Sequence, residues 1–480
     1  MASQENILVI GGGISGLACA WRLRKLGLPV LLLERSPRFG GLISTVEKNG
    51  FRFDVGPQSF LAGESLLALI QELSLAGELC KADSKAPRYI LHSGRLVRAP
   101  LGPASLLRTP LLGWKTKLRL LSEPFRHSHP PADDESIAAF VRRKFGTDIL
   151  ENLVAPFVSG VYAGDPEKLS LASAFPSLRQ FEERHGSVIR GAMKSRREAS
   201  ATSAPLYNFR QGIVTLTEAL GSQLGDSARR GVEVLDIQPR SAGASTDISA
   251  KMSDGFKIAC REDGTVHSLN AAAVILATPT SQAAQLLTKT DPRFAEALAQ
   301  IEYVGVAQVS AGYRLSQISP PGVPKPLAGF GFLVPRSERL RLLGTVWNSL
   351  LFPERAPDGP EKLAVFTSFL GGATDPDICR LSEDEIACTA RTELATAMAI
   401  SDSPIVERVA RWERALPQYN LGHARIVATL GELCRKRPGI FLAGNYLAGP
   451  SLPVCVEQAN RTAEEVAQFC AAPPSPNARP

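Results

Sequence analysis

The chain has 480 residues, more than a single ordinary core holds, so two or three domains are expected. Apolar residues make up 44% and charged residues 21%, which is typical of a globular protein. The net charge of +7 comes from scattered Lys and Arg, which argues against nucleic acid as a partner and favours an anionic substrate or an acidic membrane surface. The 8 cysteines show no Cys-x-x-Cys pair and no metal-ligand spacing, which predicts reduced thiols and no metal site.

No secretory signal and no membrane-spanning helix are expected. The first apolar run is a short strand that leads directly into a glycine turn. The longest charge-free window, residues 268–288, contains Asn270, Pro279 and Gln282. This window predicts a buried strand, a turn and a helix, and not a span of the bilayer.

The start of the chain predicts a dinucleotide-binding unit. A short apolar strand enters Gly11-Gly-Gly-Ile-Ser-Gly16, which opens a helix, and a second apolar strand ends on Glu34. Gly11 permits the tight turn, Gly13 lets the backbone approach a pyrophosphate, and Gly16 lets helix and strand pack closely. The helix N-terminus would hold the phosphates, and Glu34 has the spacing of an acid that accepts from a ribose hydroxyl. The alternative is a glycine-rich turn that binds nothing.

A second glycine pair indicates which dinucleotide is bound. Arg38-Phe-Gly-Gly41 follows the acid, residues 42–55 predict a hairpin that turns at Asn49-Gly50, and Gly56-Pro-Gln-Ser59 comes next. This combination resembles the FAD-binding amine oxidase and protoporphyrinogen oxidase superfamily, in which the second glycine pair faces the flavin diphosphate. An NAD dehydrogenase is not expected to show it. A tight turn and a hairpin without a ligand are the alternative.

The other elements are predicted from periodicity and turn residues. Residues 64–79 and most of 133–163 are expected to be helical, and a hairpin over 88–97 turns at Ser93-Gly94. Strands recur between residues 307 and 372 and predict a mixed sheet. Ser382 caps a helix over 383–399, with Glu385 completing a capping box. A strand over 440–444 and a helix over 456–469 form a closing unit.

The expected fold class is α/β with three units. A discontinuous, Rossmann-like FAD-binding domain is assembled from residues 1–80, 205–285 and 405–470. A mixed-sheet substrate-binding domain comprises residues 81–98 and 286–404. Residues 99–204 form a helical domain, for which membrane contact is one interpretation, and residues 471–480 are expected to be a disordered tail.

The membrane interpretation depends on a helix predicted between two prolines. One face of this helix carries an apolar stripe formed by Leu111, Trp114, Leu118, Leu121 and Phe125. Basic side chains flank the stripe, which suits an interfacial helix whose long side chains reach lipid headgroups. A core helix fits almost as well. If the stripe contacts lipid, the protein is expected to be cytoplasmic and peripherally associated with the inner membrane.

Within the superfamily, the chain resembles oxygen-dependent protoporphyrinogen oxidases over nearly its whole length. Four stretches carry this resemblance, namely Gly160-Val-Tyr-Ala-Gly-Asp165, Phe330-Gly-Phe-Leu-Val-Pro335, Phe369-Leu-Gly-Gly372 and Pro417-Gln-Tyr-Asn-Leu-Gly-His423. The resemblance implies that a porphyrinogen is oxidised to a porphyrin, with hydride passing to flavin N5 and then to oxygen to give hydrogen peroxide. It implies no catalytic acid or base and no metal. Oxygen, a tetrapyrrole, a membrane surface and, in a homodimer, a second copy are the expected partners.

The resemblance also implies binding residues. Residues in the FAD pocket are Gly11, Gly12, Gly13, Ile14, Ser15, Gly16, Glu34, Arg35, Leu42, Gly56, Pro57, Gln58, Ser59, Trp412, Pro450, Ser451 and Leu452. FAD is expected to be noncovalent, because no Cys or His is clearly placed as a tether. Arg88 would bind a propionate, since guanidinium offers paired donors, with a surface hairpin arginine as the alternative. The macrocycle cavity would be lined by Gly160, Phe330, Gly331, Leu333, Val346 and Phe369.

Two features depart from the family pattern. Residues 449–455 read Gly-Pro-Ser-Leu-Pro-Val-Cys, where the family commonly has Asn-Asp before the Cys, and two prolines remove backbone donors there. Gln58 stands where the family commonly has Asn. The nearest alternative function is oxidation of coproporphyrinogen III to coproporphyrin III, and a more distant one is a non-catalytic flavoprotein. A carotenoid desaturase or an amine oxidase is disfavoured by the Tyr-Ala-Gly-Asp motif.

Overall fold

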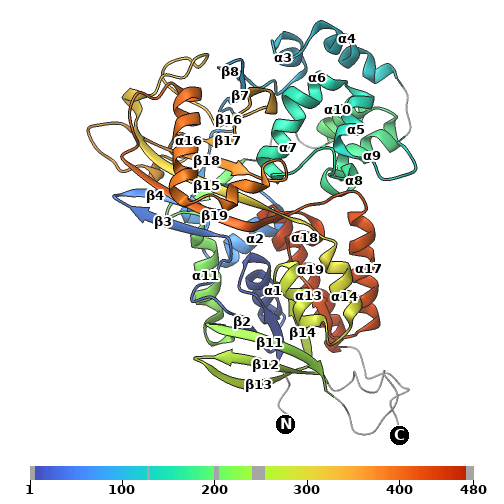
Figure 1. Cartoon of the computed structure of the whole chain (residues 1–480). Coiled ribbons are helices and arrows are strands. Elements are labelled where there is room, and N and C mark those ends of the chain that lie inside the picture. The colour runs from blue at the N-terminus through green and yellow to red at the C-terminus, as the bar shows by residue number, and fades with distance from the viewer. Residues whose placement is uncertain (1–5, 127–129, 199–204, 241–254, 472–480) are drawn as a thin grey trace.

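A parallel sheet of five strands lies in the lower half of the molecule in Figure 1. The computed structural model describes residues 6–126, 130–198, 205–240 and 255–471. The strand order is β10 (Ala228–Arg230), β2 (Val30–Glu34), β1 (Ile7–Ile10), β14 (Ala273–Leu276) and β20 (Ile440–Leu442). The first two predicted strands and the closing strand therefore lie in one sheet, although long segments separate them in the sequence.

Both faces of this sheet are buried, which explains why its strands are continuous apolar runs. Ile7 and Val9 pack on one face, with α1 (Ile14–Lys25), α2 (Glu64–Glu72), α11 (Val214–Leu224) and α19 (Leu452–Ala471). Leu8 and Ile10 pack on the other face, with α13 (Thr280–Leu287), α14 (Pro292–Ala299) and α17 (His423–Lys436). A three-stranded sheet of β11 (Val232–Pro239), β12 (Phe256–Glu262) and β13 (Thr265–Ala271) completes this second layer.

A seven-stranded mixed sheet forms the upper left part of Figure 1. Its strand order is β19 (Val406–Pro417), β15 (Tyr303–Arg314), β18 (Leu363–Gly371), β17 (Leu342–Val346), β16 (Gly331–Leu333), β7 (Arg88–His92) and β8 (Arg95–Arg98). β16 and β7 are parallel and the other pairs antiparallel, so the predicted mixed sheet is confirmed. Ala307, Val309 and Ala311 pack under α16 (Glu383–Met398), which leaves the alternate residues of β15 on the opposite face.

Short helices form a third cluster at the upper right of Figure 1. They are α3 (Pro103–Arg108), α4 (Trp114–Ser122), α5 (Ile137–Lys144), α6 (Thr147–Ile149), α7 (Ala155–Tyr162), α8 (Leu171–Ala174), α9 (Pro176–His185) and α10 (Val188–Glu198). Buried charges join them: Lys144 lies 2.9 Å from Glu182, and Glu123 accepts from the Val188 amide at 2.9 Å. Ion pairs therefore supplement a modest apolar core.

Local predictions agree closely with the structure. The hairpin of β3 (Ser44–Lys48) and β4 (Phe51–Val55) turns at Asn49-Gly50, and the β7–β8 hairpin turns at Ser93-Gly94. Ser382 and Glu385 form the predicted capping box of α16. The helix expected over 64–79 is shorter, because α2 ends at Glu72 and residues 76–78 form a separate 3₁₀ turn.

Two boundaries differ from those expected. The third FAD-binding piece was expected to begin at residue 405, but β19 pairs with β15 in the seven-stranded sheet. The substrate unit was expected to begin at residue 286, but Phe294 and Leu298 of α14 pack with the five-stranded sheet. Both segments connect the two sheets, and their apolar patterns fit either neighbour. Of the tail predicted at 471–480, residues 472–480 lie outside the described part of the chain.

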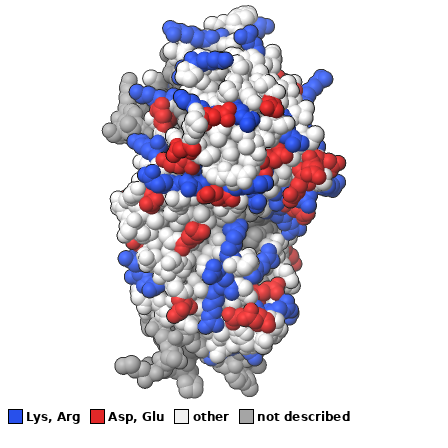
Figure 2. Space-filling view, turned by 90° about the vertical axis from the view of Figure 1, so that its left-hand side faces the viewer, with Lys and Arg blue, Asp and Glu red and all other residues white. Residues whose placement is uncertain are grey.

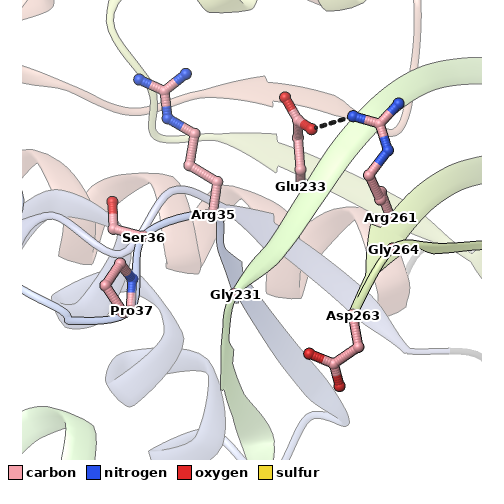
Figure 3. Close-up of a pocket in the computed structure, with 8 residues that line it drawn as sticks. All are labelled: Arg35, Ser36, Pro37, Gly231, Glu233, Arg261, Asp263 and Gly264. Carbon is pink, nitrogen blue, oxygen red and sulfur yellow. Dashed lines mark hydrogen bonds and ion pairs between the residues drawn. The ribbon is translucent and has the colours of Figure 1, made fainter.

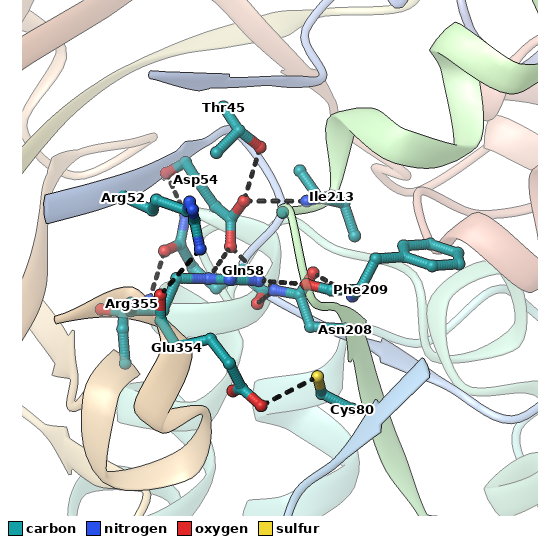
Figure 4. Close-up of polar contacts among 12 residues, drawn as sticks. Thr45, Arg52, Asp54, Gln58, Cys80, Asn208, Phe209, Ile213, Glu354 and Arg355 are labelled. Atoms are coloured by element: carbon teal, nitrogen blue, oxygen red, sulfur yellow. Dashed lines mark hydrogen bonds and ion pairs between the residues drawn. The ribbon is translucent and has the colours of Figure 1, made fainter. Parts of the chain in front are cut away.

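A buried ion pair joins Asp54 of β4 to Arg355, which lies between β17 and β18 of the seven-stranded sheet (Figure 4). Arg355 Nε donates to Asp54 Oδ2 at 2.8 Å, and the two side chains are 1% and 0% exposed. Asp54 also accepts from Thr45 Oγ1 at 2.7 Å and from the Ile213 amide at 2.9 Å. Arg355 Nη2 donates to the Phe209 carbonyl of β9 (Leu206–Phe209) at 2.9 Å. Both charges are therefore compensated by several partners.

We predict that Arg355→Leu destabilises the protein by roughly 3–5 kcal/mol, because Asp54 would remain buried without its countercharge. Denaturant unfolding followed by circular dichroism measures the change. Arg380→Leu is the matched control, since Arg380 and Asp377 lie 2.9 Å apart but are 83% and 66% exposed. In this control the free energy of unfolding should fall by less than about 1 kcal/mol. Equal losses in the two variants would contradict the importance of the buried pair.

Candidate active site

The glycine loop between β1 and α1 has the geometry of a phosphate-binding turn. Gly11 has φ +110°, and a Cβ there would lie 2.6 Å from the Ala277 carbonyl oxygen. A Cβ on Gly16 would overlap the carbonyl oxygen of Gly11. Gly13 differs, because a Cβ there would meet no heavy atom within 4 Å. The first and third glycines are thus required by the fold, while Gly13 borders open space at the helix N-terminus, where a pyrophosphate fits.

Glu34 lies at the end of β2 with its carboxylate turned to the same loop. One oxygen accepts from the Gly12 amide at 2.6 Å, and the other accepts from the Ser36 amide and hydroxyl at 2.8 and 2.6 Å. These bonds fix the carboxylate in a buried position. Each oxygen carries more than one acceptor site, so the group retains capacity for ribose hydroxyls.

The second glycine pair packs directly against the first loop. The Gly40 amide donates to the Gly12 carbonyl at 2.8 Å, and a Cβ on Gly41 would lie 3.3 Å from the Cα of Gly13. Arg38 donates to the carbonyls of Gly41 and Ile43 at 2.7 and 2.9 Å, which holds this segment in place. The two motifs predicted to face one diphosphate therefore adjoin each other.

The C-terminal segment also reaches this loop. Leu452 is buried at the first position of α19, and the Ser15 hydroxyl of α1 contacts the Cys455 thiol. Pro453, which departs from the family pattern, occupies the first turn of α19, where a missing backbone donor costs nothing. Pro450 and Ser451 precede the helix and are more exposed. Burial raises the pKa of Cys455 to about 11, so its thiol stays protonated.

A hollow of about 450 Å³ lies beside the end of β2 (Figure 3). Arg35 and Ser36 line one side of it, and the start of β11 and the β12–β13 turn line the other. Glu233 and Arg261, 2.8 Å apart, form an ion pair at its edge. The structure thus places Arg35 on the open surface next to Glu34, at the end of the cofactor site expected to hold the adenosine.

The turn formed by residues 56–59 follows β4 and contacts β15 of the seven-stranded sheet through Gln308. Gly56 has φ +96°, and a Cβ there would overlap the carbonyl oxygen of Leu42, so this turn packs against the segment after the second glycine pair. The Gln58 amide nitrogen donates to the carbonyls of Asp54 and Gly56 at 3.0 and 2.8 Å. Gln58 therefore closes the turn internally, an arrangement that its longer side chain permits. Pro57 and Ser59 complete the turn.

The residues predicted to line the macrocycle cavity come together on one face of the seven-stranded sheet, and we call them the apolar wall. Directly opposed residues share a face, so the register places Gly331 with Val346, and Gly344 with Phe369, on this side. A Cβ on Gly160 of α7 would overlap the Leu333 side chain, so α7 packs against the wall. The apolar wall comprises Gly160, Phe330, Gly331, Leu333, Val346 and Phe369. Trp412 lies on the same face, opposite Val306.

Arg88 lies at the edge of the apolar wall. It is opposite Gly331 in the β7–β16 pair, and its guanidinium carbon is 5.1 Å from the centre of the Phe330 ring. Within the described ranges no carboxylate forms an ion pair with Arg88. A guanidinium stacked on an aromatic ring and lacking an internal partner is available to an anionic ligand.

Buried polar side chains that sequence reasoning missed lie on the same face. Gln308 accepts from the Gly56 amide at 3.0 Å and donates to the Asp54 carbonyl at 2.6 Å and to Ser310 at 3.1 Å. Ser310 in turn lies 3.0 Å from the Thr367 hydroxyl. Gln308 and Ser310 alternate in an otherwise apolar strand, which was the available signal. Because Gln308 is opposite Phe369, the apolar wall is tied directly to the 56–59 turn.

Two buried ionisable groups, on α7 and α17, have shifted pKa values. Burial lowers the pKa of His423 and raises that of Tyr162. Among the described residues, no group of three or more His, Cys, Asp or Glu could hold a metal ion. The geometry therefore provides a dinucleotide cradle beside an apolar surface with one cation at its edge.

The dinucleotide cradle and the adjoining apolar face of the second sheet fit a flavin-dependent oxidoreductase. The model of the flavin containing amine oxidoreductase family matches residues 14–468. The chain belongs to this family, and it is an FAD-dependent oxidoreductase.

Several relatives cover almost the whole chain. A chloroplastic protoporphyrinogen oxidase of Nicotiana tabacum is 31% identical over 98% of this chain and 86% of its own. The human protoporphyrinogen oxidase is 32% identical over 96% of this chain and 98% of its own, and the coproporphyrinogen III oxidase of Bacillus subtilis is 30% identical over 95% and 96%. A crystal structure from Exiguobacterium sp. 255-15, named as a candidate protoporphyrinogen oxidase, superimposes with a TM-score of 0.79 at 24% identity, over 98% of this chain and 99% of that one.

We predict that Gly13→Val abolishes FAD retention, because the new side chain would occupy the open space beside the helix N-terminus. The ratio of flavin to protein absorbance after purification measures this. Gly102→Val is the matched control: Gly102 also precedes a helix in an extended conformation, and a Cβ there would meet nothing within 4 Å. The control should retain flavin. A fully yellow Gly13→Val protein would exclude the glycine loop as the phosphate site.

Proposed function

We propose that the chain oxidises protoporphyrinogen IX to protoporphyrin IX with FAD and oxygen, releasing hydrogen peroxide. The assembly of the apolar wall next to the 56–59 turn is the observation that carries this proposal. A tetrapyrrole offers a broad hydrocarbon surface with carboxylates on one side. The wall matches the first feature, and Arg88 at its edge matches the second.

The residues of the chain bind, orient and exclude water. FAD, when bound, supplies a two-electron acceptor, and the glycine loops, Glu34 and the 56–59 turn would hold it. The apolar wall would press the macrocycle toward that turn and keep water out, while Arg88 fixes its rotation through a propionate. No side chain is assigned as acid or base, and burial raises the pKa of Tyr162 and lowers that of His423.

FAD is held without a covalent bond in this proposal. A thiol tether requires a reactive thiolate. Burial raises the pKa of Cys455, the cysteine that contacts the glycine loop, to about 11, and the pKa of Cys19 on α1 to about 12. Acid precipitation should therefore release all of the flavin into the supernatant.

Coproporphyrinogen III is the competing substrate, as the Bacillus subtilis relative indicates. It carries additional carboxylates, each of which needs a polar partner when it leaves water. The apolar wall itself offers none. We therefore expect a higher kcat/KM for protoporphyrinogen when both substrates are assayed with the same holoenzyme, and the reverse preference would select the alternative.

Arg88→Ala should lower kcat/KM for protoporphyrinogen by roughly five- to a hundredfold, which corresponds to about 1–3 kcal/mol, because a buried propionate loses its charge-assisted partner. Arg88→Lys should recover part of the loss, since charge remains without the two-pronged geometry. Steady-state fluorescence of the porphyrin product measures both, and flavin content should not change.

The control for Arg88 is a substrate whose propionates are esterified. The loss caused by Arg88→Ala should shrink on the ester, because there is no carboxylate to bind. Arg98 belongs to the same hairpin and is paired with Tyr89, so it lies on the other face of the sheet from Arg88. Arg98→Ala should therefore leave kcat/KM nearly unchanged. Equal losses on acid and ester would mean that Arg88 only holds the hairpin together.

Peripheral membrane contact through α4 is a further part of the proposal. Trp114, Leu118, Leu121 and Phe125 are 67%, 57%, 54% and 83% exposed, whereas Leu111 is buried. The side turned to the core is formed instead by Leu112, which precedes α4, and by Thr116 and Leu120 of α4. The interpretation of the stripe as core is therefore wrong for these four side chains. No helix in the described ranges is long and apolar enough to cross a membrane.

The exposed stripe is held firmly in this orientation. Thr116 donates to Asp148 at 2.8 Å, and Arg119 donates to the carbonyls of Arg142 and Arg143 at the end of α5 at 3.0 and 2.7 Å. Lys115 flanks the stripe and is exposed. Lys and Arg atoms crowd the upper end of the molecule in Figure 2, the end formed by α3 and α4 in Figure 1. Apolar side chains surrounded by cations suit an anionic lipid surface.

We predict that replacing Trp114, Leu118 and Leu121 together by Ser reduces co-sedimentation with anionic lipid vesicles at least tenfold and leaves FAD content unchanged. Replacing Leu26, Val266 and Ile405 by Ser is the control, since these are also exposed apolar residues but lie on other elements. The control should sediment like the original protein. Unchanged sedimentation of the α4 variant would exclude this surface as the lipid contact.

A further inference from the structure

Asn348 carries a buried acceptor that no group in the described part of the chain uses. It follows β17 at the start of α15 (Asn348–Leu351) and is 2% exposed. Its amide nitrogen donates to Gln58 Oε1 at 2.7 Å, and its Oδ1 has no hydrogen-bond partner. An unpaired amide oxygen at such depth is unfavourable, and a ligand that donates to it would supply the missing hydrogen bond.

The orientation of this amide is fixed by its neighbours. Gln58 Nε2 donates to two backbone carbonyls, those of Asp54 and Gly56, so Gln58 must present its oxygen to Asn348. An oxygen can only accept, and Asn348 must therefore present its nitrogen. Turning the Asn348 amide over would place two oxygens against each other. Its Oδ1 is consequently the free atom.

The position of Asn348 brings this acceptor to the proposed catalytic face. Val346 belongs to the apolar wall, and Trp347 points to the opposite face, where it is fully buried under α16. The chain then returns Asn348 to the wall side, as its contact with the 56–59 turn demonstrates. Asn348 thus lies between the macrocycle wall and the turn expected to hold the flavin.

We propose that Asn348 is a ligand-binding residue whose Oδ1 accepts a hydrogen bond from a buried N–H group. Both ligands of the proposed reaction carry such a donor, the imide N–H of the flavin ring and the pyrrole N–H of the tetrapyrrole. For the pyrrole donor this inference rests on the proposed function, whereas for the flavin donor it does not. The hydrogen bond to Gln58 orients the acceptor, so Gln58 acts as a positioning residue for Asn348.

The test compares Asn348→Leu, Gln58→Met and the double variant. FAD affinity is measured by quenching of flavin fluorescence when apoprotein is reconstituted. Affinity for protoporphyrin IX is measured by porphyrin fluorescence on the holoenzyme. Ser349→Ala is the matched control, because Ser349 is the next residue of α15 and accepts from the Val365 amide without touching Gln58. Thermal unfolding of every variant identifies any that fold poorly.

Asn348→Leu should weaken one of the two affinities roughly five- to a hundredfold, and Ser349→Ala should change neither. Weaker FAD binding assigns the flavin as the donor, and weaker porphyrin binding with unchanged FAD affinity assigns the pyrrole. Adding Asn348→Leu to Gln58→Met should cause a smaller further loss than Asn348→Leu causes alone, because without Gln58 the Oδ1 acceptor is present but no longer oriented. An undiminished further loss in that background overturns the positioning role of Gln58, and no loss in either affinity overturns the proposal. If the original protein fails to bind porphyrin, the proposed function fails, while the FAD measurement still tests Asn348.

Discussion

The position of the 56–59 turn relative to the seven-stranded sheet depends on the buried pair of Asp54 and Arg355. Asp54 lies in β4, the second strand of the hairpin that follows the second glycine pair, and Arg355 follows the strand that carries Val346. Two desolvated charges tolerate little change in their separation, because each loses its compensation when the other moves. The pair therefore fixes the 56–59 turn relative to the apolar wall. Gln308 adds a second link through the Gly56 amide and the Asp54 carbonyl.

This arrangement distributes the proposed binding residues over two sheets. The glycine loops and Glu34 lie on the five-stranded sheet, and the apolar wall and Arg88 lie on the seven-stranded sheet. Neither sheet contains the complete site. A ligand that bridges the two would meet a geometry set by buried contacts and not by mobile side chains, which is how proximity lowers a reaction barrier. Substitutions at Asp54 or Arg355 can therefore alter that geometry without touching a ligand.

Local features could be predicted from the sequence because they depend on few neighbouring residues. The roles of Gly11 and Gly16 follow from a strand, a turn and a helix, and the structure gives each the expected close contact. The capping box at Ser382 and the turns of both hairpins are local in the same sense. The helical wheel of residues 111–125 placed Trp114 and Leu118 on one face, but it could not indicate whether that face or the one with Leu112 and Leu120 met the core.

Features that join distant segments could not be predicted in this way. Gln308 reaches Gly56 across 252 positions, and Asn348 reaches Gln58 across 290. An amide in a buried strand is usually a satisfied structural group, and only the spatial register shows which polar atoms meet. Gln58, which stands where the family commonly has Asn, illustrates this. Its longer side chain closes the turn through two carbonyls and leaves one oxygen for Asn348, so a change from the family pattern becomes interpretable only when its partners are known.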